Sequence, residues 1–255
     1  MQMNGYAVRR IRRRARRLIY KGFLVTALIF LIVSVIVMTA KMLSFSISGN
    51  LFHQFKSIEL PAMLSGTKTA DLDHGWNLIL VNSKNRIPGD YEAELIQLSN
   101  GKQVDERIYP ELQEMFDAAR ADGLHLFVSE GYRTREEQQL LLDEKTEAYE
   151  MEGHSKSEAE KLAKQWVAVP GFSEHQLGIA VDINADHAGS TDDEVYTWLA
   201  ENSWQYGFIK RYPSDKTEIT GTINEPWHYR YVGKEAAREI VSQGVCLEEY
   251  VEMLE

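Results

Sequence analysis

Residues 173–182 read SEHQLGIAVD, and residues 225–228, further along the chain, read EPWH. The first segment supplies one imidazole, His175, and one carboxylate, Asp182, while the second supplies another imidazole, His228. A catalytic zinc ion takes three protein ligands from His, Asp, Glu or Cys and leaves its fourth tetrahedral position to water. The two segments therefore predict an open zinc site formed by His175, Asp182 and His228.

Glu225 is the candidate proton carrier of this site. Zinc lowers the pKa of a bound water from about 15.7 to near 7, yet an amide nitrogen leaves poorly unless a nearby group protonates it. Glu225 precedes His228 closely and is not needed as a ligand, so the pattern predicts a hydrolase in which Glu225 is catalytic. Glu174 is next to His175, but adjacent residues on an extended chain point apart, so we expect Glu174 behind the ligands or at the surface.

The residues around Asp182 have the alternation of a strand. Val181 and Ile183 point to one face of an extended chain and Asp182 to the other. A carboxylate that is the polar exception in an apolar run needs a partner, and a metal ion is a suitable one. We expect His175 on the loop that leads into this strand and His228 on a second strand.

The remaining histidines and the cysteine have simpler interpretations. A lone histidine is more often a surface or core residue than a ligand, and the nearest competitor, His187, lies in the turn-like segment DHAGS at 186–190. The single cysteine, Cys246, excludes a disulfide within the chain and a cysteine-rich zinc site, and we interpret it as a small buried residue. We assign no metal to the other five histidines, which are His53, His74, His125, His154 and His187.

The ordered motifs S-x-H-x-x-G-x-A-x-D and E-P-W-H resemble those of the VanY-type D-alanyl-D-alanine carboxypeptidases of the bacterial cell wall and of their L,D-carboxypeptidase relatives. Two further segments are similar to that family: WNLILVN at 76–82, and GYRT at 131–134 followed by Glu137 and Gln138. The resemblance extends over residues 76 to 245. It implies a hedgehog/DD-peptidase-like fold, one Zn²⁺ ion per chain and peptidoglycan stem peptides as substrates.

Arg133, in the GYRT motif, is the candidate for the substrate side of the site. A carboxypeptidase must bind the terminal carboxylate of its substrate and stabilise the oxyanion of the tetrahedral intermediate. A guanidinium can do either, and one well-aimed donor contributes about 3 to 4 kcal/mol to transition-state stabilisation. A surface ion pair between Arg133 and Glu136 or Glu137 is the competing interpretation.

The rest of the substrate pocket follows from the resemblance and from neighbouring aromatic residues. Similarity to the family implies that Gln138 and Ser173 line the pocket together with Arg133. Aromatic residues beside such motifs are either pocket walls or core residues. Three are candidate walls here: Tyr132, Trp227 and Tyr229. One difference affects this side of the site, because Glu130 stands where family members often carry a serine, and Ser129 lies one position earlier.

The charge of the chain is distributed unevenly. Its 255 residues contain 28 basic and 38 acidic side chains, for a net charge of −10 at pH 7. Eight of the basic residues lie between positions 9 and 21, so the other 20 basic residues face all 38 acidic ones, a balance of −18. This excess of acidic side chains argues against nucleic-acid binding by the folded part. The length is sufficient for one domain with a stable core plus appendages.

Residues 23–40 are uncharged and read FLVTALIFLIVSVIVMTA, which approaches the roughly 20 residues needed to span a bilayer. The arginine-rich segment before this run would stay in the cytoplasm by the positive-inside rule. The predicted organisation is a basic cytoplasmic tail at 1–22, a transmembrane helix at 23–43, an extracellular stalk at 44–75 and a zinc carboxypeptidase domain at 76–255. The expected location is the bacterial cell membrane, crossed once, with the catalytic domain outside.

Two other interpretations apply to this N-terminal part. A cleaved signal peptide has basic and apolar regions in the same order, but its apolar region is usually about 7 to 15 residues long and ends at a small-x-small site. The apolar run here is longer, and the sequence MTA at 38–40 is a poor cleavage site. A nucleic-acid-binding arm is the other possibility for the arginines, although membrane topology explains them more simply.

The domain pattern predicts an α+β fold with an antiparallel sheet and flanking helices. The clearest helix has one apolar face formed by Ile108, Leu112, Met115, Phe116 and Ala119. Another begins at a capping box in which Thr134 is the N-cap and Glu137 the carboxylate three residues on. Strands are predicted at 76–82, 124–128, around 182 and at 227–232, with a further segment at 208–212. Helices are predicted over 108–119, 134–151, 157–167, 195–199 and 234–244.

Together these features predict a membrane-anchored, zinc-dependent carboxypeptidase that removes the C-terminal D-alanine from peptidoglycan stem peptides outside the cell. The substrate class is implied by the resemblance alone. Within the enzyme class, L,D-carboxypeptidase action on tetrapeptide stems and endopeptidase cleavage of crosslinks stay open. A non-catalytic, zinc-stabilised wall-binding module is the alternative from another class, but a structural zinc would need neither Glu225 nor Arg133.

Overall fold

The computed structural model describes residues 66–255. The predicted tail at 1–22, the predicted transmembrane helix at 23–43 and most of the predicted stalk lie outside the described residues. Within 66–255, no helix is both long enough and apolar enough to cross a membrane. Residues 66–75, the last part of the predicted stalk, contribute the short strand β1 (Lys68–Thr69) and the buried Ala70 to the folded unit. The folded unit therefore extends upstream of Trp76.

The centre of the described part is an antiparallel sheet of four strands, as the alternation of the sequence predicts. Its spatial order is β5 (Leu126–Glu130), β6 (Ala180–Ala185), β8 (His228–Tyr231) and β7 (Phe208–Lys210). A separate antiparallel hairpin, which the sequence analysis does not predict, joins β3 (Leu95–Gln97) to β4 (Gln103–Asp105). Strand β1 pairs in parallel with β2 (Asn85–Arg86).

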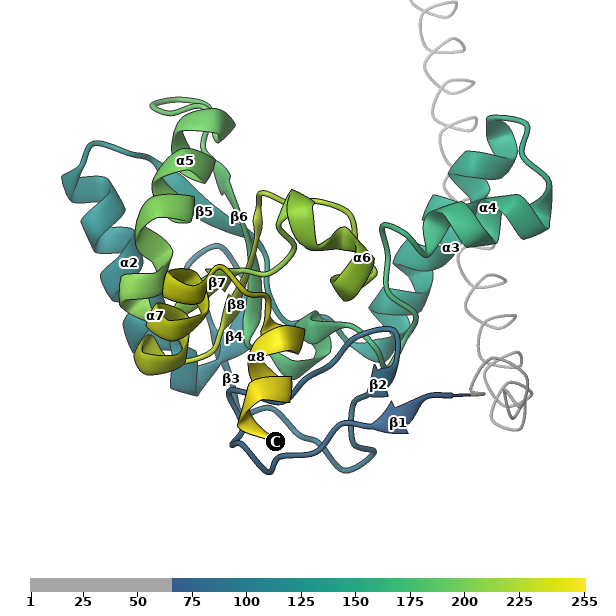
Figure 1. The fold of residues 1–255 in the computed structure, drawn as a ribbon. Helices are drawn as coiled ribbons and strands as arrows, with labels where there is room; N and C mark the ends of the chain where they lie inside the picture. Colours follow the sequence, from purple (N-terminus) through teal and green to yellow (C-terminus); the bar gives the residue numbers. More distant parts are fainter. Residues whose placement is uncertain (1–65) are drawn as a thin grey trace, which may run out of the picture. The chain divides into compact units, whose positions relative to one another are not determined.

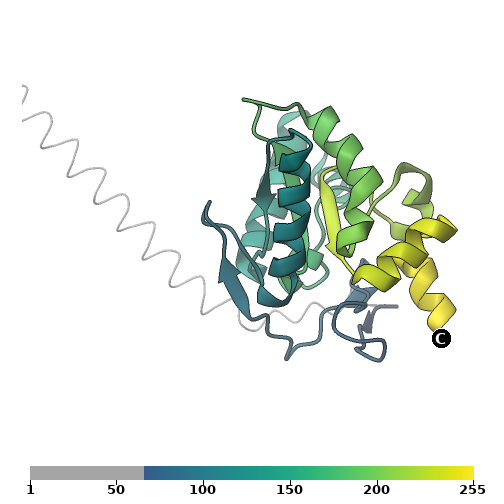
Figure 2. The ribbon, with the colours of Figure 1, turned by 90° about the vertical axis from the view of Figure 1, so that its left-hand side faces the viewer.

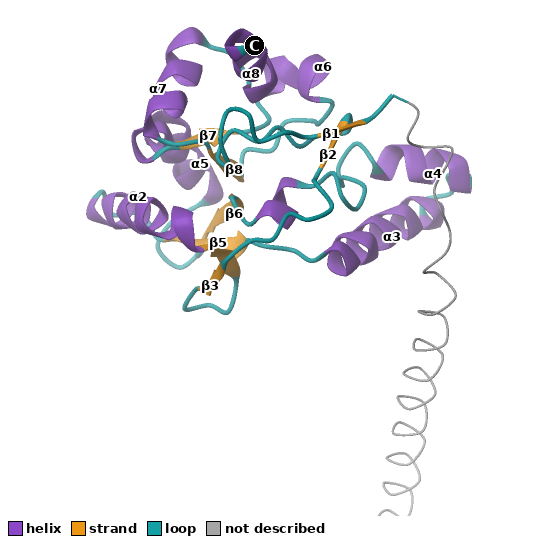
Figure 3. Ribbon diagram, turned by 90° about the horizontal axis from the view of Figure 1, so that it is seen from below, coloured by secondary structure: helices purple, strands orange, loops and turns teal. Residues whose placement is uncertain are grey.

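Helices flank this sheet. The α-helices are α2 (Tyr109–Ala121), α3 (Arg135–Met151), α4 (Lys156–Ala163), α5 (Asp192–Asn202), α6 (Thr217–Thr220), α7 (Lys234–Gln243) and α8 (Leu247–Leu254). The 3₁₀ helices are η2 (Glu106–Ile108), η3 (Glu174–Leu177), η4 (Ser203–Tyr206) and η5 (Ser214–Lys216). Helices α2 and α5 lie on one side of the sheet, while α3 packs against α4 away from it (Figure 1). Figure 2 shows α2 and α5 in front of the strands, and Figure 3 shows the same layers from below.

Local sequence signals place most of these helices. The apolar face predicted for the first helix is buried in α2, and the predicted capping box starts α3, where Thr134 and Glu137 exchange side-chain to backbone hydrogen bonds. The helix predicted at 157–167 is shorter than expected, since α4 ends at Ala163. Helix α8 was not predicted, although Cys246 precedes it as a buried residue, as expected for the cysteine.

The strand predicted at 76–82 is wrong. Its apolar residues Ile79 and Val81 are buried, as the alternation indicates, but the segment forms no strand, and only its last residue, Asn82, makes an isolated bridge with Asn85. Instead, the guanidinium of Arg230 donates hydrogen bonds to the carbonyls of Asn77 and Ile79 over 3.0 and 2.8 Å. A buried backbone needs hydrogen-bond partners, and here a side chain replaces a strand as the partner.

The two faces of the sheet differ in chemistry. Val181 and Ile183 of β6, with Tyr229 of β8, point into the core beneath α2 and α5. Asp182 and His228, which are directly opposite each other in the register, point to the other face. The period of a strand therefore puts the core and the candidate ligands on opposite sides of the same two strands.

Candidate active site

Three elements bring the predicted ligands together. Strands β6 and β8 place Asp182 opposite His228, and η3 carries His175 to the same point. His175 Nε2 is 3.4 Å from Asp182 Oδ1, and His228 Nδ1 is 3.1 Å from the same oxygen. One ligand atom from each residue lies within 4.8 Å of the others. Residues far apart in the chain thus present two imidazole nitrogens and a carboxylate oxygen to one point.

The ring of His175 is oriented by the backbone. Its Nδ1 is 2.8 Å from the carbonyl of Gly131, so Nδ1 carries the proton and Nε2 is free to bind a metal. Gly131 must be glycine, because a Cβ there would stand 2.2 Å from the carbonyl oxygen of Gln103. Gly178 closes η3 in the left-handed region at a φ of 75°, which favours glycine. The glycines of both motifs therefore hold the ligand His175 in place.

The ligand group fits a divalent cation. All three residues are largely buried, and Asp182 Oδ1 has no hydrogen-bond donor among the described residues. Burial would raise the pKa of Asp182, but the imidazoles of His175 and His228 outweigh it and hold that pKa well below its usual range. Burial would lower the pKa of His228, but its carboxylate neighbours Asp182 and Glu174 raise it to about 9. The site thus favours positive charge where the ligand atoms converge.

Glu225 lies beside this group and is not part of it. Its side chain is largely buried, and Oε2 is 3.7 Å from His228 Nδ1. Its backbone N–H donates to the carbonyl of Tyr212, which fixes the EPWH turn against the end of β7. Burial raises the pKa of Glu225 to about 7, with Asp182 adding to this effect and His228 opposing it. The carboxyl group is therefore within reach of the ligands without binding in their place.

Arg133 is held in place by side chains other than those expected. Neither Glu136 nor Glu137 pairs with it; Nη2 of Arg133 is 3.4 Å from Glu130 Oε2, and Nη1 donates to Gln138 Oε1 over 2.8 Å. The Arg133 backbone N–H donates to the carbonyl of His175 over 3.1 Å. The backbone of Arg133 is thus tied to the motif of the first ligand, while its guanidinium is held by Glu130 and Gln138.

Gln138 and Glu130 act as the supports of Arg133. Gln138 is buried and donates through Nε2 to the carbonyl of Ala168 over 2.7 Å, so its other end is fixed. Burial would raise the pKa of Glu130, but Lys102 and Arg133 lower it below 4.5. Lys102 Nζ is 3.0 Å from Glu130 Oε1, so the residue that departs from the family pattern is part of an ion-pair chain. Gln138 therefore contacts Arg133, whereas direct contact of Gln138 with a substrate stays a prediction.

The remaining predicted pocket residues are divided between the two faces of the sheet. Ser173 is buried at the start of η3, and Tyr132 and Trp227 are half-buried next to the motifs. Tyr229 is fully buried in the core on the opposite face and cannot wall the pocket. Strand alternation explains this, because neighbours of His228 along β8 point away from it.

Two further residues complete the site: Tyr212, which the sequence did not indicate, and Glu174, for which the structure selects the position behind the ligands from the two that were expected. Tyr212 packs its ring 4.9 Å from that of His228, and burial raises the pKa of its hydroxyl well above 10, so it remains a neutral phenol. Glu174 is fully buried and not at the surface, with Oε2 3.6 Å from His228 Nε2. Strand alternation puts Arg230 of β8 on the same face as His228. Because a buried arginine needs an acidic partner, this pattern could have indicated a buried acid near this ligand.

The other histidines take no part in the ligand group. His125, His154 and His187 are exposed and His74 is half-buried, while His53 lies outside the described residues. His187 is 3.6 Å from Asp192 at an exposed turn, with a φ of 56°. Within residues 66–255, none of these four histidines lies in the ligand group, which is His175, Asp182 and His228.

The family model that describes VanY, a D-alanyl-D-alanine carboxypeptidase, matches residues 101–234. A D-alanyl-D-alanine carboxypeptidase from Enterococcus faecalis is 59% identical over 188 residues, which cover 74% of this chain and 70% of the relative. The matched range of the family model contains every predicted site residue, from Tyr132 to His228.

Two solved structures are similar to the described fold. One is a mutant of the vancomycin resistance D,D-pentapeptidase VanY in complex with Zn(II); it is 62% identical, has a TM-score of 0.68, and the match covers 69% of this chain and 99% of that one. The other is VanYB in complex with D-alanine-D-alanine, 60% identical with a TM-score of 0.70, covering 71% of this chain and 99% of the other. Both identities are high enough for the likeness to extend beyond the fold.

Proposed function

We propose, starting from the fact that this chain belongs to the VanY family of D-alanyl-D-alanine carboxypeptidases, that it removes the C-terminal D-alanine from peptidoglycan stem peptides. The chain is a zinc-dependent peptidase. The observation that carries the proposal is the convergence of His175, Asp182 and His228 next to the buried carboxyl group of Glu225.

Zinc would be held by Nε2 of His175, a carboxylate oxygen of Asp182 and Nδ1 of His228. When bound, it would lower the pKa of a water at the open position to near 7 and polarise the carbonyl of the scissile bond. His175 keeps its orientation through Gly131, and Asp182 is held on β6 facing both imidazoles. The ligand set of two histidines and one carboxylate, with one position left for water, is that of a catalytic site and not a closed structural one.

Glu225 would take a proton from the attacking water and deliver it to the amine of the departing D-alanine. Its position, 3.7 Å from a ligand nitrogen and largely out of solvent, suits a group that must reach both the water and the leaving nitrogen. Arg133 would bind the terminal carboxylate of the substrate or the developing oxyanion, because Gln138 and Glu130 hold its guanidinium and its backbone N–H is bonded to the carbonyl of the ligand His175.

The test of this proposal is the pair of variants Glu225→Gln and Glu218→Gln. Gln at 225 keeps the shape and removes the proton acceptor, so D-alanine release from a pentapeptide stem should fall by about 10²- to 10⁴-fold while zinc content is unchanged. Glu218 is exposed on α6 and serves as the control, with turnover expected to equal that of the wild type. Normal turnover of Glu225→Gln would remove Glu225 from the mechanism. No D-alanine release by the zinc-loaded wild type would instead favour the non-catalytic, zinc-stabilised wall-binding module.

Substrate length separates this activity from the related alternatives. A D,D-carboxypeptidase releases D-alanine from a pentapeptide stem, whereas an L,D-carboxypeptidase releases it from a tetrapeptide and an endopeptidase cleaves crosslinked dimers. We expect the pentapeptide to be preferred, in line with relatives that are named D-alanyl-D-alanine carboxypeptidases. Comparison of D-alanine release and dimer cleavage at equal substrate concentration decides between the three.

The location and the N-terminal part of the proposal rest on the sequence. Residues 23–43 would form one transmembrane helix with residues 1–22 in the cytoplasm, so the catalytic domain would act outside the bacterial cell membrane beside the wall. Protease treatment of cells without their outer wall should remove the domain and leave the tail protected. Mass spectrometry of the mature protein checks the signal-peptide alternative, which predicts a chain that begins near residue 41.

A further inference from the structure

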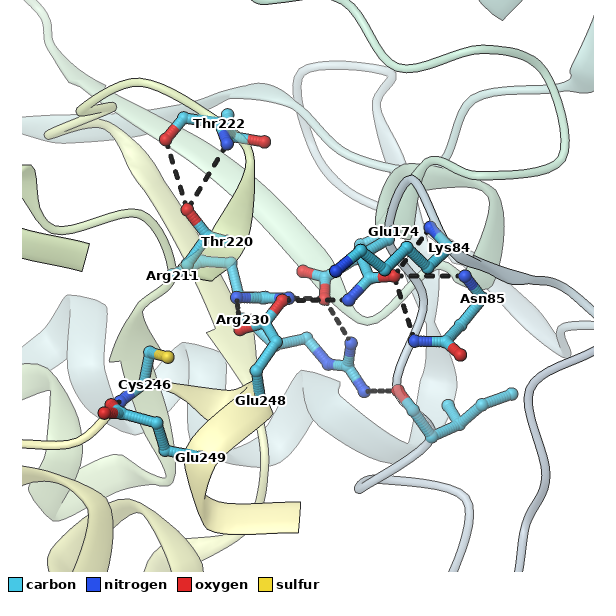
Figure 4. Close-up of polar contacts among 12 residues, drawn as sticks. Lys84, Asn85, Glu174, Arg211, Thr220, Thr222, Arg230, Cys246, Glu248 and Glu249 are labelled. Atoms are coloured by element: carbon cyan, nitrogen blue, oxygen red, sulfur yellow. Dashed lines mark hydrogen bonds and ion pairs between the residues drawn. The ribbon is translucent and has the colours of Figure 1, made fainter. Parts of the chain in front are cut away.

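A buried ion cluster lies directly behind the ligand His228. Glu174 Oε1 accepts hydrogen bonds from Arg211 Nε over 2.8 Å and from Arg230 Nη1 over 2.7 Å (Figure 4). The side chains of Glu174, Arg211 and Arg230 are all 0% exposed. Two guanidiniums on one carboxylate oxygen leave the other oxygen, Oε2, available to a further partner.

That further partner is the imidazole of His228. Oε2 of Glu174 and Nε2 of His228 are 3.6 Å apart, within ion-pair distance, both are buried, and neither has a hydrogen-bond partner in the part of the chain that the structure describes. The opposite ring nitrogen, Nδ1, faces Asp182 at 3.1 Å. A carboxylate behind the ring favours the tautomer with the proton on Nε2, and this leaves the Nδ1 lone pair for the metal.

The C-terminal helix α8 closes the other end of the cluster. Arg211 donates from Nη1 and Nη2 to both oxygens of Glu248 over 2.8 and 2.7 Å, and Asn82 Nδ2 donates to Glu248 Oε1 over 3.1 Å. A bidentate pair of this kind fixes the plane of the guanidinium as well as its charge. Glu248 lies on α8, outside the residues 101–234 that the family model matches.

We infer that Glu174 is a positioning residue for the ligand His228, and that Glu248 of α8 keeps Glu174 in place through Arg211. The contacts run without interruption from α8 to the metal position: Glu248 to Arg211, Arg211 to Glu174, and Glu174 to His228. With two guanidiniums and two carboxylates, the charges of the cluster balance, so the buried carboxylate of Glu174 can stay ionised behind the ring.

A comparison of two neighbouring glutamates on α8 tests this inference. Glu248 pairs with Arg211 in the cluster, whereas the half-buried Glu249 pairs with Lys216, 2.9 Å away, and accepts a hydrogen bond from the Cys246 N–H at the start of α8. Zn²⁺ affinity of the full-length protein would be measured by competition with a chromophoric chelator for the wild type, Glu174→Gln, Glu248→Gln and Glu249→Gln. We expect affinity to fall by about 10- to 100-fold in Glu174→Gln and by about 3- to 10-fold in Glu248→Gln, with no change in Glu249→Gln.

The melting temperatures of the zinc-loaded and metal-free proteins separate positioning from a purely structural role. A structural role lowers both temperatures equally, whereas weaker binding reduces the increase that saturating zinc produces. If Glu174→Gln does not fold, Glu248→Gln decides, because Arg211 then keeps Glu174 as a partner. Equal zinc affinity in Glu248→Gln and Glu249→Gln would overturn the coupling to α8, and a Glu174→Gln protein with normal affinity would overturn the positioning role.

This inference rests on the zinc site of the proposed function, and the wild-type titration distinguishes the two. If the wild-type protein binds no zinc, the proposed function fails together with the inference. If the wild type binds zinc tightly and releases D-alanine while the variants bind zinc equally well, the proposed function stands and only the inference fails.

Discussion

The two faces of the four-stranded sheet are formed by the same strands but have different roles. Beneath α2 and α5, Val181, Ile183 and Tyr229 are fully buried among apolar neighbours. On the other face, Asp182 and His228 meet His175, with charged groups packed behind them. The first face contributes stability by burial of apolar surface, whereas the second holds polar groups whose burial is costly unless a partner is present. Changes on one face should therefore affect stability and on the other affect chemistry.

The largest effect is expected from Asp182→Ala on the polar face. The change removes the carboxylate between the two imidazoles, so the site should lose zinc and D-alanine release should fall by more than about 10⁴-fold, or roughly 5 kcal/mol. Metal analysis and the pentapeptide assay measure both quantities. Chelator-treated wild type, which should recover activity when zinc is added back, is the control, and substantial turnover by the variant would show that the carboxylate is not a ligand.

Arg133→Ala should have the next largest effect, still on the polar face. Loss of a well-aimed donor is expected to lower kcat/KM by about 10²- to 10³-fold, while Gln138 retains its bond to Ala168 and zinc stays bound. Arg135→Ala is the matched control, since Arg135 is an exposed arginine two positions on, and its kcat/KM should equal that of the wild type. Similar losses in both variants would show that nearby positive charge matters and the specific contact does not.

Ile183→Val tests the apolar face one residue from a ligand. Removal of one buried methylene should lower the free energy of unfolding by about 0.5 to 1.5 kcal/mol, measured by urea unfolding of the metal-free protein. Zinc affinity and kcat/KM should not change, because the side chain points away from the site. A clear loss of zinc affinity would mean that the two faces are not independent.

The smallest effect is expected from Glu248, on the polar face, which should make the unfolding free energy depend on acid pH. Burial would raise the pKa of Glu248, but the charge and hydrogen bonds of Arg211 lower it below 4.5. A carboxylate with a lowered folded-state pKa stabilises the fold above its unfolded pKa, and that stability is lost as the pH falls through the folded pKa. The difference in unfolding free energy between metal-free wild type and Glu248→Gln should shrink by about 1 kcal/mol or less between pH 6 and pH 3. If the difference in unfolding free energy does not change with pH, the effect of Glu248 on stability does not come from its charge.

Local patterns predicted the elements that depend on neighbouring residues. The capping box at Thr134 starts α3, and the apolar face of the first predicted helix is buried in α2. The alternation around Asp182 also predicted which side of β6 is polar. The segment 76–82 shows the limit of such patterns, because its alternation is compatible with a strand but its hydrogen-bond partner is a side chain distant in sequence.

The same limit applies to the site. The residue types at His175, Asp182, Glu225 and His228 indicated the metal chemistry, since few other patterns bring two imidazoles and two carboxylates into such motifs. The supports of those residues could not be predicted. Arg133 pairs with Glu130 and Gln138 and not with the glutamates nearest to it in α3, because the segment 131–134 turns back towards η3.

The sequence by itself determined the types of the candidate ligands, the candidate proton carrier beside them, the helices with strong local signals and the α+β class. The tertiary structure alone decided that Glu174 is buried behind His228, that Tyr229 belongs to the core, and that α8 is linked to the metal position by way of Arg211. The physical reason is that side-chain identity and short-range periodicity are properties of neighbouring residues. Burial and ion pairing, by contrast, depend on which distant segments the fold brings together.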